Sequence, residues 1–208
     1  MIELSCCSLY DVGGIKMKTG AGKNFRAVDL VFTALFAALT AVCAVIAVPM
    51  PMTTVPVSLL VLGVYLTGAL LEKKLAFLAE LVYLLVGAVG IPVFSGFSSG
   101  VGVLFGPTGG YLLASPLMAF LIAWIIEPFR KRKNLLYLAM LVVGMVSALL
   151  VCYLFGTVWF CIYGKYTFLQ GLGFCVIPFL VPDAIKLAAA VVVAAAVDTA
   201  FQKIRAHA

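Results

Sequence analysis

Six apolar segments dominate the sequence and restrict what the chain can fold into. Each is 15 to 21 residues long, and basic residues fall in short clusters between them; the segments are 30–48, 56–71, 75–89, 109–126, 135–155 and 183–201. With 65% hydrophobic and only 11% charged residues, a soluble domain would have too few polar side chains to cover its surface. The sequence therefore predicts an integral membrane protein.

The fold class that these segments indicate is an all-α membrane protein with six transmembrane helices in a compact bundle. No segment alternates with period two over ten residues, which argues against spanning strands. Several segments are nearer 15 than about 20 residues, so we expect tilted or partly covered helices. We expect residues 1–25 to form an N-terminal cytoplasmic extension without the pattern of a signal peptide, with Met17 an alternative start. Residues 26–208 then form the six-helix membrane domain.

The distribution of basic residues predicts the topology. Twelve of the fourteen fall before the first segment, between the second and third, between the fourth and fifth, or after the sixth: Lys16, Lys18, Lys23, Arg26, Lys73, Lys74, Arg130, Lys131, Arg132, Lys133, Lys203 and Arg205. Only Lys165 and Lys186 remain for the other side. The positive-inside rule then places both termini in the cytoplasm of a multi-pass protein of the cell membrane. Clusters between apolar segments indicate membrane topology, so the net charge of +6 does not point to nucleic acid.

Three connections on the outer side have an unusual composition. Residues 48–58 are rich in proline, 90–110 in glycine, and 155–183 in glycine and aromatic residues. Loops this long in a compact bundle are usually functional or disordered, and these are too apolar for a solvated linker. We expect them to fold over the outer mouth of the bundle, which puts a ligand site near the outer face.

Asp183 and Lys186 are two charges at the start of the last apolar segment. Three residues apart on a helix, they share a face and reach each other. The helix dipole favours an acid in the first turn but not a base, and Lys186 is isolated on the basic-poor side. The pair is therefore interpreted as part of a ligand site, with a purely structural ion pair as the alternative.

Two further motifs are open to two interpretations each. "FGPTGG" (105–110) directly precedes the fourth segment, where its backbone N–H groups either cradle a ligand oxygen or only form a tight turn. The first segment carries two small-xxx-small ridges that either dock a partner helix or pack internally; they are Ala34 with Ala38, and Ala37 with Ala41. Glu80, in the third segment, faces either the bundle interior or the cytoplasmic water.

The sequence gives little support to catalysis or to a metal site. His207 is the sole histidine, the six cysteines form no CxxC pair, and no paired carboxylates have the spacing of metal ligands. The glycine-rich segment lacks the lysine of a P-loop. We therefore expect a binding protein rather than an enzyme, with neither a metal nor a cofactor.

Three stretches together resemble a known family. "VPMPMTTVPVSLLVLGVYLTGALL" (48–71), "YLLVGAVGIPVFSGFSSGVGVLFGPTGGYLLA" (83–114) and "VIPFLVPDAIKLAAA" (176–190) resemble the BioY family, the biotin-binding S-components of energy-coupling factor (ECF) transporters. The resemblance extends over residues 26–205. It implies six membrane helices, a vitamin site near the outer face capped by loops, and a first-helix ridge that contacts a coupling subunit, here Ala34 and Ala38.

The resemblance also implies which residues meet the ligand. Biotin has a carboxylate, a ureido group and an apolar ring and tail, so Lys186 and Asp183 suit its polar ends. Further hydrogen bonds are expected from backbone groups of the glycine-rich loop and from the hydroxyls of Ser95, Ser98, Ser99, Thr108 and Tyr111. Candidates for the apolar wall are Phe94, Phe97, Trp159 and Tyr163.

The function implied is a substrate-capture subunit that binds biotin outside the cell. ATP is then hydrolysed by two ATP-binding cassette subunits joined to a transmembrane coupling subunit of the EcfT type. One alternative is a different vitamin or a biotin precursor on the same scaffold, because family members often have Thr-Leu-Gln-Thr where this chain has Ser-Leu-Leu-Val at 58–61. The others are an autonomous secondary transporter, for which only Glu80 is a candidate ion-coupling carboxylate, and an intramembrane enzyme.

Overall fold

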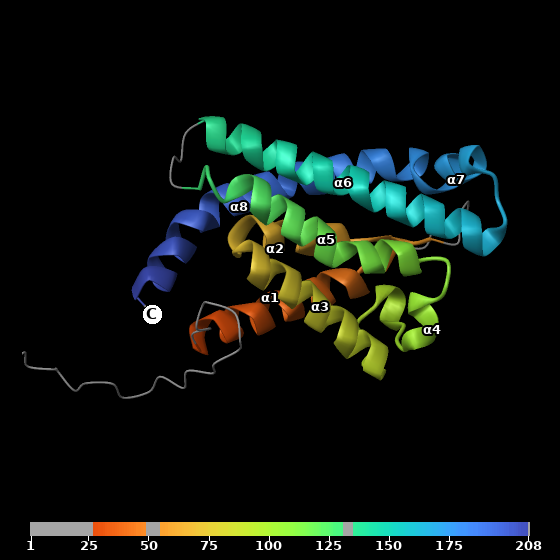
Figure 1. Ribbon diagram of the computed structural model, residues 1–208, viewed down its shortest axis with the longest axis horizontal. Coiled ribbons are helices and arrows are strands. Elements are labelled where there is room, and N and C mark those ends of the chain that lie inside the picture. The colour runs from red at the N-terminus through yellow and green to blue at the C-terminus, as the bar shows by residue number, and fades with distance from the viewer. Residues whose placement is uncertain (1–26, 49–54, 131–134, 208) are drawn as a thin grey trace, which may run out of the picture.

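The computed structural model describes residues 27–48, 55–130 and 135–207, and it is almost entirely helical (Figure 1). The α-helices are α1 Ala27–Val45, α2 Leu60–Leu70, α3 Lys73–Val89, α4 Val101–Leu104, α5 Gly109–Ile126, α6 Leu135–Gly164, α7 Phe168–Cys175 and α8 Leu180–His207. Two 3₁₀ turns, η1 Ser95–Phe97 and η2 Ile177–Phe179, and a two-residue antiparallel ladder, β1 Ala47–Val48 with β2 Val57–Ser58, complete the described elements. The expected all-α class is confirmed. The N-terminal extension expected at 1–25 lies outside the described residues.

Within the described residues, four helical spans are long and apolar enough to cross a membrane. They are Ala27–Val45, Gly109–Ile126, Leu135–Gly164 and Phe168–Asp198, and in each of them part of the surface is not buried by the rest of the protein. Such helices suit a bilayer because their backbone groups are hydrogen-bonded internally and their exposed side chains are apolar. The fold is therefore that of a helical membrane protein.

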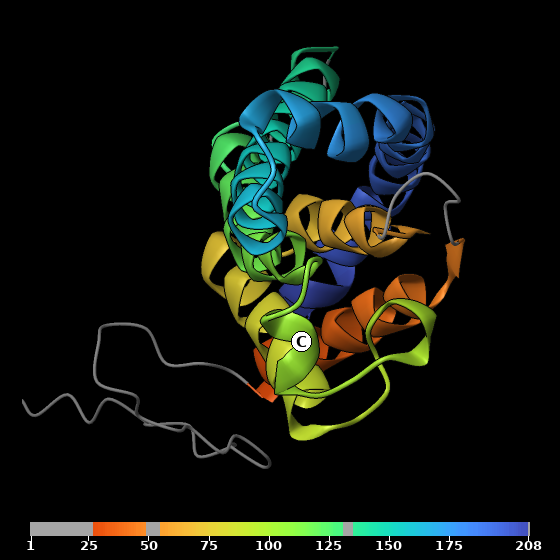
Figure 2. The same ribbon diagram turned by 90° about the vertical axis from the view of Figure 1, so that its right-hand side faces the viewer.

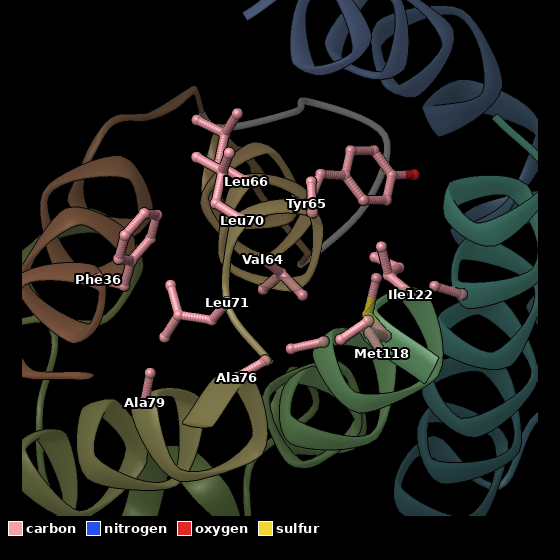
Figure 3. Packing of buried hydrophobic residues seen from close by; sticks show 14 of the residues in the cluster. Phe36, Val64, Tyr65, Leu66, Leu70, Leu71, Ala76, Ala79, Met118 and Ile122 are labelled. Atoms are coloured by element: carbon pink, nitrogen blue, oxygen red, sulfur yellow. The ribbon is translucent and has the colours of Figure 1, made fainter. Parts of the chain in front are cut away.

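Helix α2 occupies the centre of the bundle. It has only 11 residues, and nine of them are buried. Phe36 of α1, Ala76 and Ala79 of α3, and Met118 and Ile122 of α5 surround it (Figure 3). A helix that is apolar all round is stable only inside other elements, which explains why this segment carries no polar face.

The two ends of the bundle differ in character. The start of α1, the end of α5 and the end of α8 lie at the left of Figure 1, whereas α4 and α7 lie at the right. Figure 2 views this second end directly, with α4 in front and α7 across the top. The glycine-rich and aromatic segments build the second end, which we call the loop end.

One sequence expectation was wrong. Residues 155–183 are not a long loop: α6 continues to Gly164, and α7 and η2 fill most of the remainder. Thr167 and Gln170 form a capping box at the start of α7, where the Thr167 backbone N–H donates to Gln170 Oε1 at 3.1 Å. The aromatic side chains that suggested an apolar loop are equally compatible with helix, so composition alone did not separate the two.

Candidate ligand-binding site

A cavity of about 270 Å³ lies near the loop end of the bundle. Its wall combines residues at and just before β2, the first halves of α2, α5 and α8, the glycine-rich segment and the middle of α6. Most of the wall is apolar, including Val55, Pro56, Leu60, Val61, Val64, Val103, Leu112, Met118 and Phe179. A mostly apolar cavity with a few convergent polar groups is the usual form of a small-molecule site.

The polar centre of this cavity consists of Asp183, Lys186 and Tyr153. Lys186 Nζ lies 2.7 Å from Asp183 Oδ1, and the side chains of Lys186 and Asp183 are only 7% and 3% exposed. The Tyr153 hydroxyl donates to Asp183 Oδ2, also at 2.7 Å. Asp183 lies in the first turn of α8, where the helix dipole stabilises a negative charge. Both carboxylate oxygens are thus held in place by a donor.

This arrangement leaves donor capacity for a ligand. An ammonium group has three N–H donors, and among the described residues Lys186 gives one of them to Asp183. The remaining donors suit an anion or a carbonyl oxygen. Because the pair is neutral as a whole, it also tolerates burial better than either charge alone would.

The glycine-rich segment is anchored to the bundle by Phe94. Its ring is fully buried and packs edge-on against Tyr83, with ring centroids 5.7 Å apart. It also lies directly on Gly87, where a β-carbon would collide with the ring. The Gly100 backbone N–H donates to the Gly87 carbonyl oxygen at 2.8 Å. These contacts hold the segment over one side of the cavity.

The cavity wall includes seven of the eleven ligand-binding residues predicted from the sequence: Phe94, Ser95, Ser98, Thr108, Tyr111, Asp183 and Lys186. Their hydroxyl and charged groups come from the glycine-rich segment on one side and α8 on the other. The wall therefore brings together segments that are about 90 residues apart in the sequence.

Four predicted residues are not on the wall: Ser99, Phe97, Trp159 and Tyr163. Phe97 and Tyr163 are 71% and 58% exposed. Trp159 instead contacts the glycine-rich segment outside the cavity: its indole N–H donates to the Gly106 carbonyl oxygen at 2.9 Å. Its side chain also packs so closely on Gly110 that a β-carbon there would collide with it.

The wall also contains polar residues that the sequence did not single out as ligand-binding: Ser58, Ser115 and Tyr153. Tyr153 lies in the middle of a long apolar segment, and nothing local distinguishes it from a packing residue. Ser58 does carry a signal, since it begins the four residues that depart from the family pattern.

The structure separates the two alanine ridges of α1. Ala34 and Ala38 are exposed on the outside of the bundle, whereas Ala37 is buried and Ala41 half-buried. Ala37 thus packs internally, as the alternative interpretation held. Of the two ridges, Ala34 with Ala38 is the one that is open to a partner helix.

The fold and the cavity together define a class: a helical membrane protein with a small-molecule cavity near one end. A model of the BioY family matches residues 17–203 of this chain. The chain therefore belongs to the BioY family.

Individual relatives agree with this assignment. The probable biotin transporter BioY of Pyrococcus horikoshii is 41% identical over 169 residues, which cover 81% of this chain and 95% of the relative. The biotin transporter BioY2 of Lactococcus lactis is 37% identical over 164 residues, covering 79% and 86%. A crystal structure of the S-component for biotin from an ECF-type ABC transporter has a similar fold, with a TM-score of 0.74 at 22% identity over 83% of this chain and 91% of that one.

Proposed function

We propose that this protein is the substrate-capture subunit of an ECF-type vitamin transporter and that it binds biotin at the outer side of the membrane. The observation that carries the proposal is the buried Asp183–Lys186 pair on the wall of an apolar cavity, in a chain of the BioY family. The protein is a transport component and not an enzyme.

The chemistry of the cavity matches the chemistry of biotin. Lys186 pairs with the carboxylate or donates to the ureido carbonyl, while Asp183 accepts a ureido N–H through a lone pair that Tyr153 and Lys186 leave free. Hydroxyls of Ser95, Ser98 and Thr108 supply further donors and acceptors. The apolar wall receives the ring and tail.

The topology proposed has six membrane helices: α1, α2, α3, α5, α6 and α8. Helices α2 and α3, with 11 and 17 residues, are short for a bilayer, but α2 is enclosed by its neighbours and needs no lipid-facing length. Both termini lie in the cytoplasm, because twelve of the fourteen basic residues belong to sequence segments that this topology places on that side. The protein is then a multi-pass protein of the cell membrane, with residues 26–208 as its membrane domain.

Energy must come from partner subunits. The sequence has no P-loop, so ATP hydrolysis falls to two ATP-binding cassette subunits, and a transmembrane coupling subunit of the EcfT type links them to this chain. The exposed Ala34 and Ala38 on α1 allow close approach of a helix of that subunit.

Uptake in cells tests the function as a whole. Cells that express this chain with its partners are expected to accumulate labelled biotin at nanomolar supply, and deletion of this chain should abolish that uptake. Unchanged uptake after deletion contradicts the proposal. Uptake into proteoliposomes without partners, lost when an ion gradient is collapsed, would favour an autonomous secondary transporter instead.

A different vitamin or a biotin precursor is the second candidate. Leu60 and Val61 line the cavity at positions where the sequence departs from the family pattern towards apolar residues. A ligand binds well when each of its buried polar groups finds a hydrogen-bond partner on the wall. Replacing polar wall residues by apolar ones therefore changes which ligand the cavity prefers. Competition of unlabelled vitamins against labelled biotin on the purified protein separates the two candidates.

Replacing Tyr153 by phenylalanine is expected to weaken biotin binding by at most about 1.5–3 kcal/mol, the usual contribution of a hydrogen bond to a charged group. The change removes only the hydroxyl that donates to Asp183 Oδ2, so Asp183 becomes less well oriented. Titration calorimetry measures the affinity. Tyr163→Phe is the matched control, because Tyr163 lies on the same helix and is exposed; equal losses in both variants would rule out this role.

A further inference from the structure

A buried carboxyl group on α3 has no part in the proposed ligand chemistry. Glu80 is fully buried, and three hydroxyls from three other helices surround it. Thr40 of α1 donates to Glu80 Oε1 at 2.8 Å, and the hydroxyls of Thr67 on α2 and Ser115 on α5 face the same carboxyl group. Thr40 and Thr67 are themselves 3.3 Å apart. Glu80 thus lies where α1, α2, α3 and α5 meet.

The hydrogen bonds around Glu80 leave its carboxyl group with few donors. Thr67 donates its single hydroxyl hydrogen to the Gly63 carbonyl oxygen, and Ser115 donates its own to the Leu112 carbonyl oxygen, both at 2.9 Å. The single hydrogens of these two hydroxyls are therefore not available to Glu80. Glu80 Oε2 is buried and has no hydrogen-bond donor among the described residues. An ionised carboxylate would thus keep a single hydrogen-bond donor among the described side chains, Thr40, whereas a carboxylic acid has no charge that needs further donors.

The surrounding charges lead to the same conclusion. Lys186, the buried lysine of the cavity, already pairs with Asp183. The titratable groups that face Glu80 are Cys43 from α1 and Tyr83 from α3, and neither supplies a positive charge. From α2 and α5, the described residues offer it only hydroxyls. A buried carboxylate without a cation or several donors is unfavourable.

We propose that Glu80 is a proton-binding site that remains a neutral carboxylic acid at neutral pH and joins the cavity wall to helix α1. Ser115 lines the cavity, and Thr40 lies on the buried face of α1, opposite the exposed Ala34 and Ala38. The hydrogen bonds of one acid therefore connect the wall of the ligand cavity with the helix proposed to dock the coupling subunit. The proton site itself is independent of the ligand's identity; its link to ligand binding rests on the proposed function.

Infrared spectroscopy of the purified full-length protein at pH 7 tests the proton site. An ionised carboxylate gives no acid carbonyl band, so we expect an acid carbonyl band at pH 7 that comes from Glu80. Labelling glutamate with carbon-13 should shift this band. Glu80→Gln should remove it, and Glu127→Gln, which changes an exposed carboxylate paired with Lys73 at 2.9 Å, should leave it intact.

Two results would overturn the proton site. One is a wild-type spectrum without any acid band that shifts on glutamate labelling. This result needs only the wild-type protein, so it holds even if Glu80→Gln does not fold. The other is a thermal stabilisation by sodium over choline chloride that Glu80→Gln removes, because it would place a metal ion where we place a proton.

Addition of biotin tests the link to the cavity. Biotin should shift the acid band of the wild-type protein, and Ser115→Ala, at a biotin concentration shown by calorimetry to saturate it, should keep the band but remove the shift. Biotin that raises the melting temperature without shifting the band disproves the link. If biotin does not bind at all, the proposed function is wrong. The proton site is then still tested by the infrared spectrum of the protein without biotin.

Discussion

Lys186→Ala is expected to weaken biotin binding by several kcal/mol. A hydrogen bond to a charged group contributes about 1.5–3 kcal/mol, which is roughly tenfold to a hundredfold in affinity. The substitution also leaves Asp183 buried without its cation, since the two groups are 2.7 Å apart and nearly inaccessible to water. Titration calorimetry on the purified protein measures the loss. Lys165→Ala is the control, because Lys165 is an exposed lysine at the loop end and its removal should change nothing.

Thermal melts of Lys186→Ala, Asp183→Asn and the double variant separate a binding pair from a purely structural one. If the pair is only structural, removing one partner costs about 3–5 kcal/mol of stability, and the double replacement restores it. If the pair also binds the ligand, the single variants lose the stabilisation that biotin confers, whatever their melting temperature without biotin. Single variants that melt early and still bind biotin would contradict the ligand-site interpretation.

Ala38→Trp is expected to abolish biotin uptake in cells while leaving the affinity of the purified protein within about twofold of the wild type. Ala34 and Ala38 form the exposed small-residue ridge of α1, and close helix packing in a membrane requires small side chains at the contact. A tryptophan there holds the partner helix away without touching the cavity. Co-purification with the coupling subunit measures docking directly.

Leu150→Trp is the matched control for this variant. Leu150 is 63% exposed on α6, so a tryptophan there meets lipid rather than the proposed partner, and both docking and uptake should persist. Loss of biotin binding together with docking in Ala38→Trp would show that the ridge supports the bundle itself.

The charged part of the candidate site was predictable because membrane segments rarely contain isolated charges. Asp183 and Lys186 stood out against an apolar background, and the structure brings them to the cavity wall. The hydroxyl of Tyr153 was not predictable, because its role depends on α6 and α8 coming together in three dimensions. The same holds for Ser115, which reaches both the cavity and Glu80 only through the packing of α5.

The fold was predictable where segment length and polarity determine it. Apolar runs located the long helices, but their ends were less certain: α6 continues nine residues beyond the predicted end, from 155 to Gly164. Aromatic and glycine residues are compatible with both a covering loop and a helix inside a membrane, so the extension had no sequence signal. The central position of α2 also required the structure, although its lack of a polar face is visible in the sequence.

Native mass spectrometry of the purified protein tests the central claim most directly, because it identifies the small molecule that the cavity retains. Expression in cells supplied with a mixture of vitamins should yield protein that carries biotin with one molecule per chain, and Lys186→Ala prepared in parallel should lose it. Protein that carries a different vitamin, or that carries none and fails to retain added biotin, would contradict the assignment of this chain as the biotin-capturing subunit.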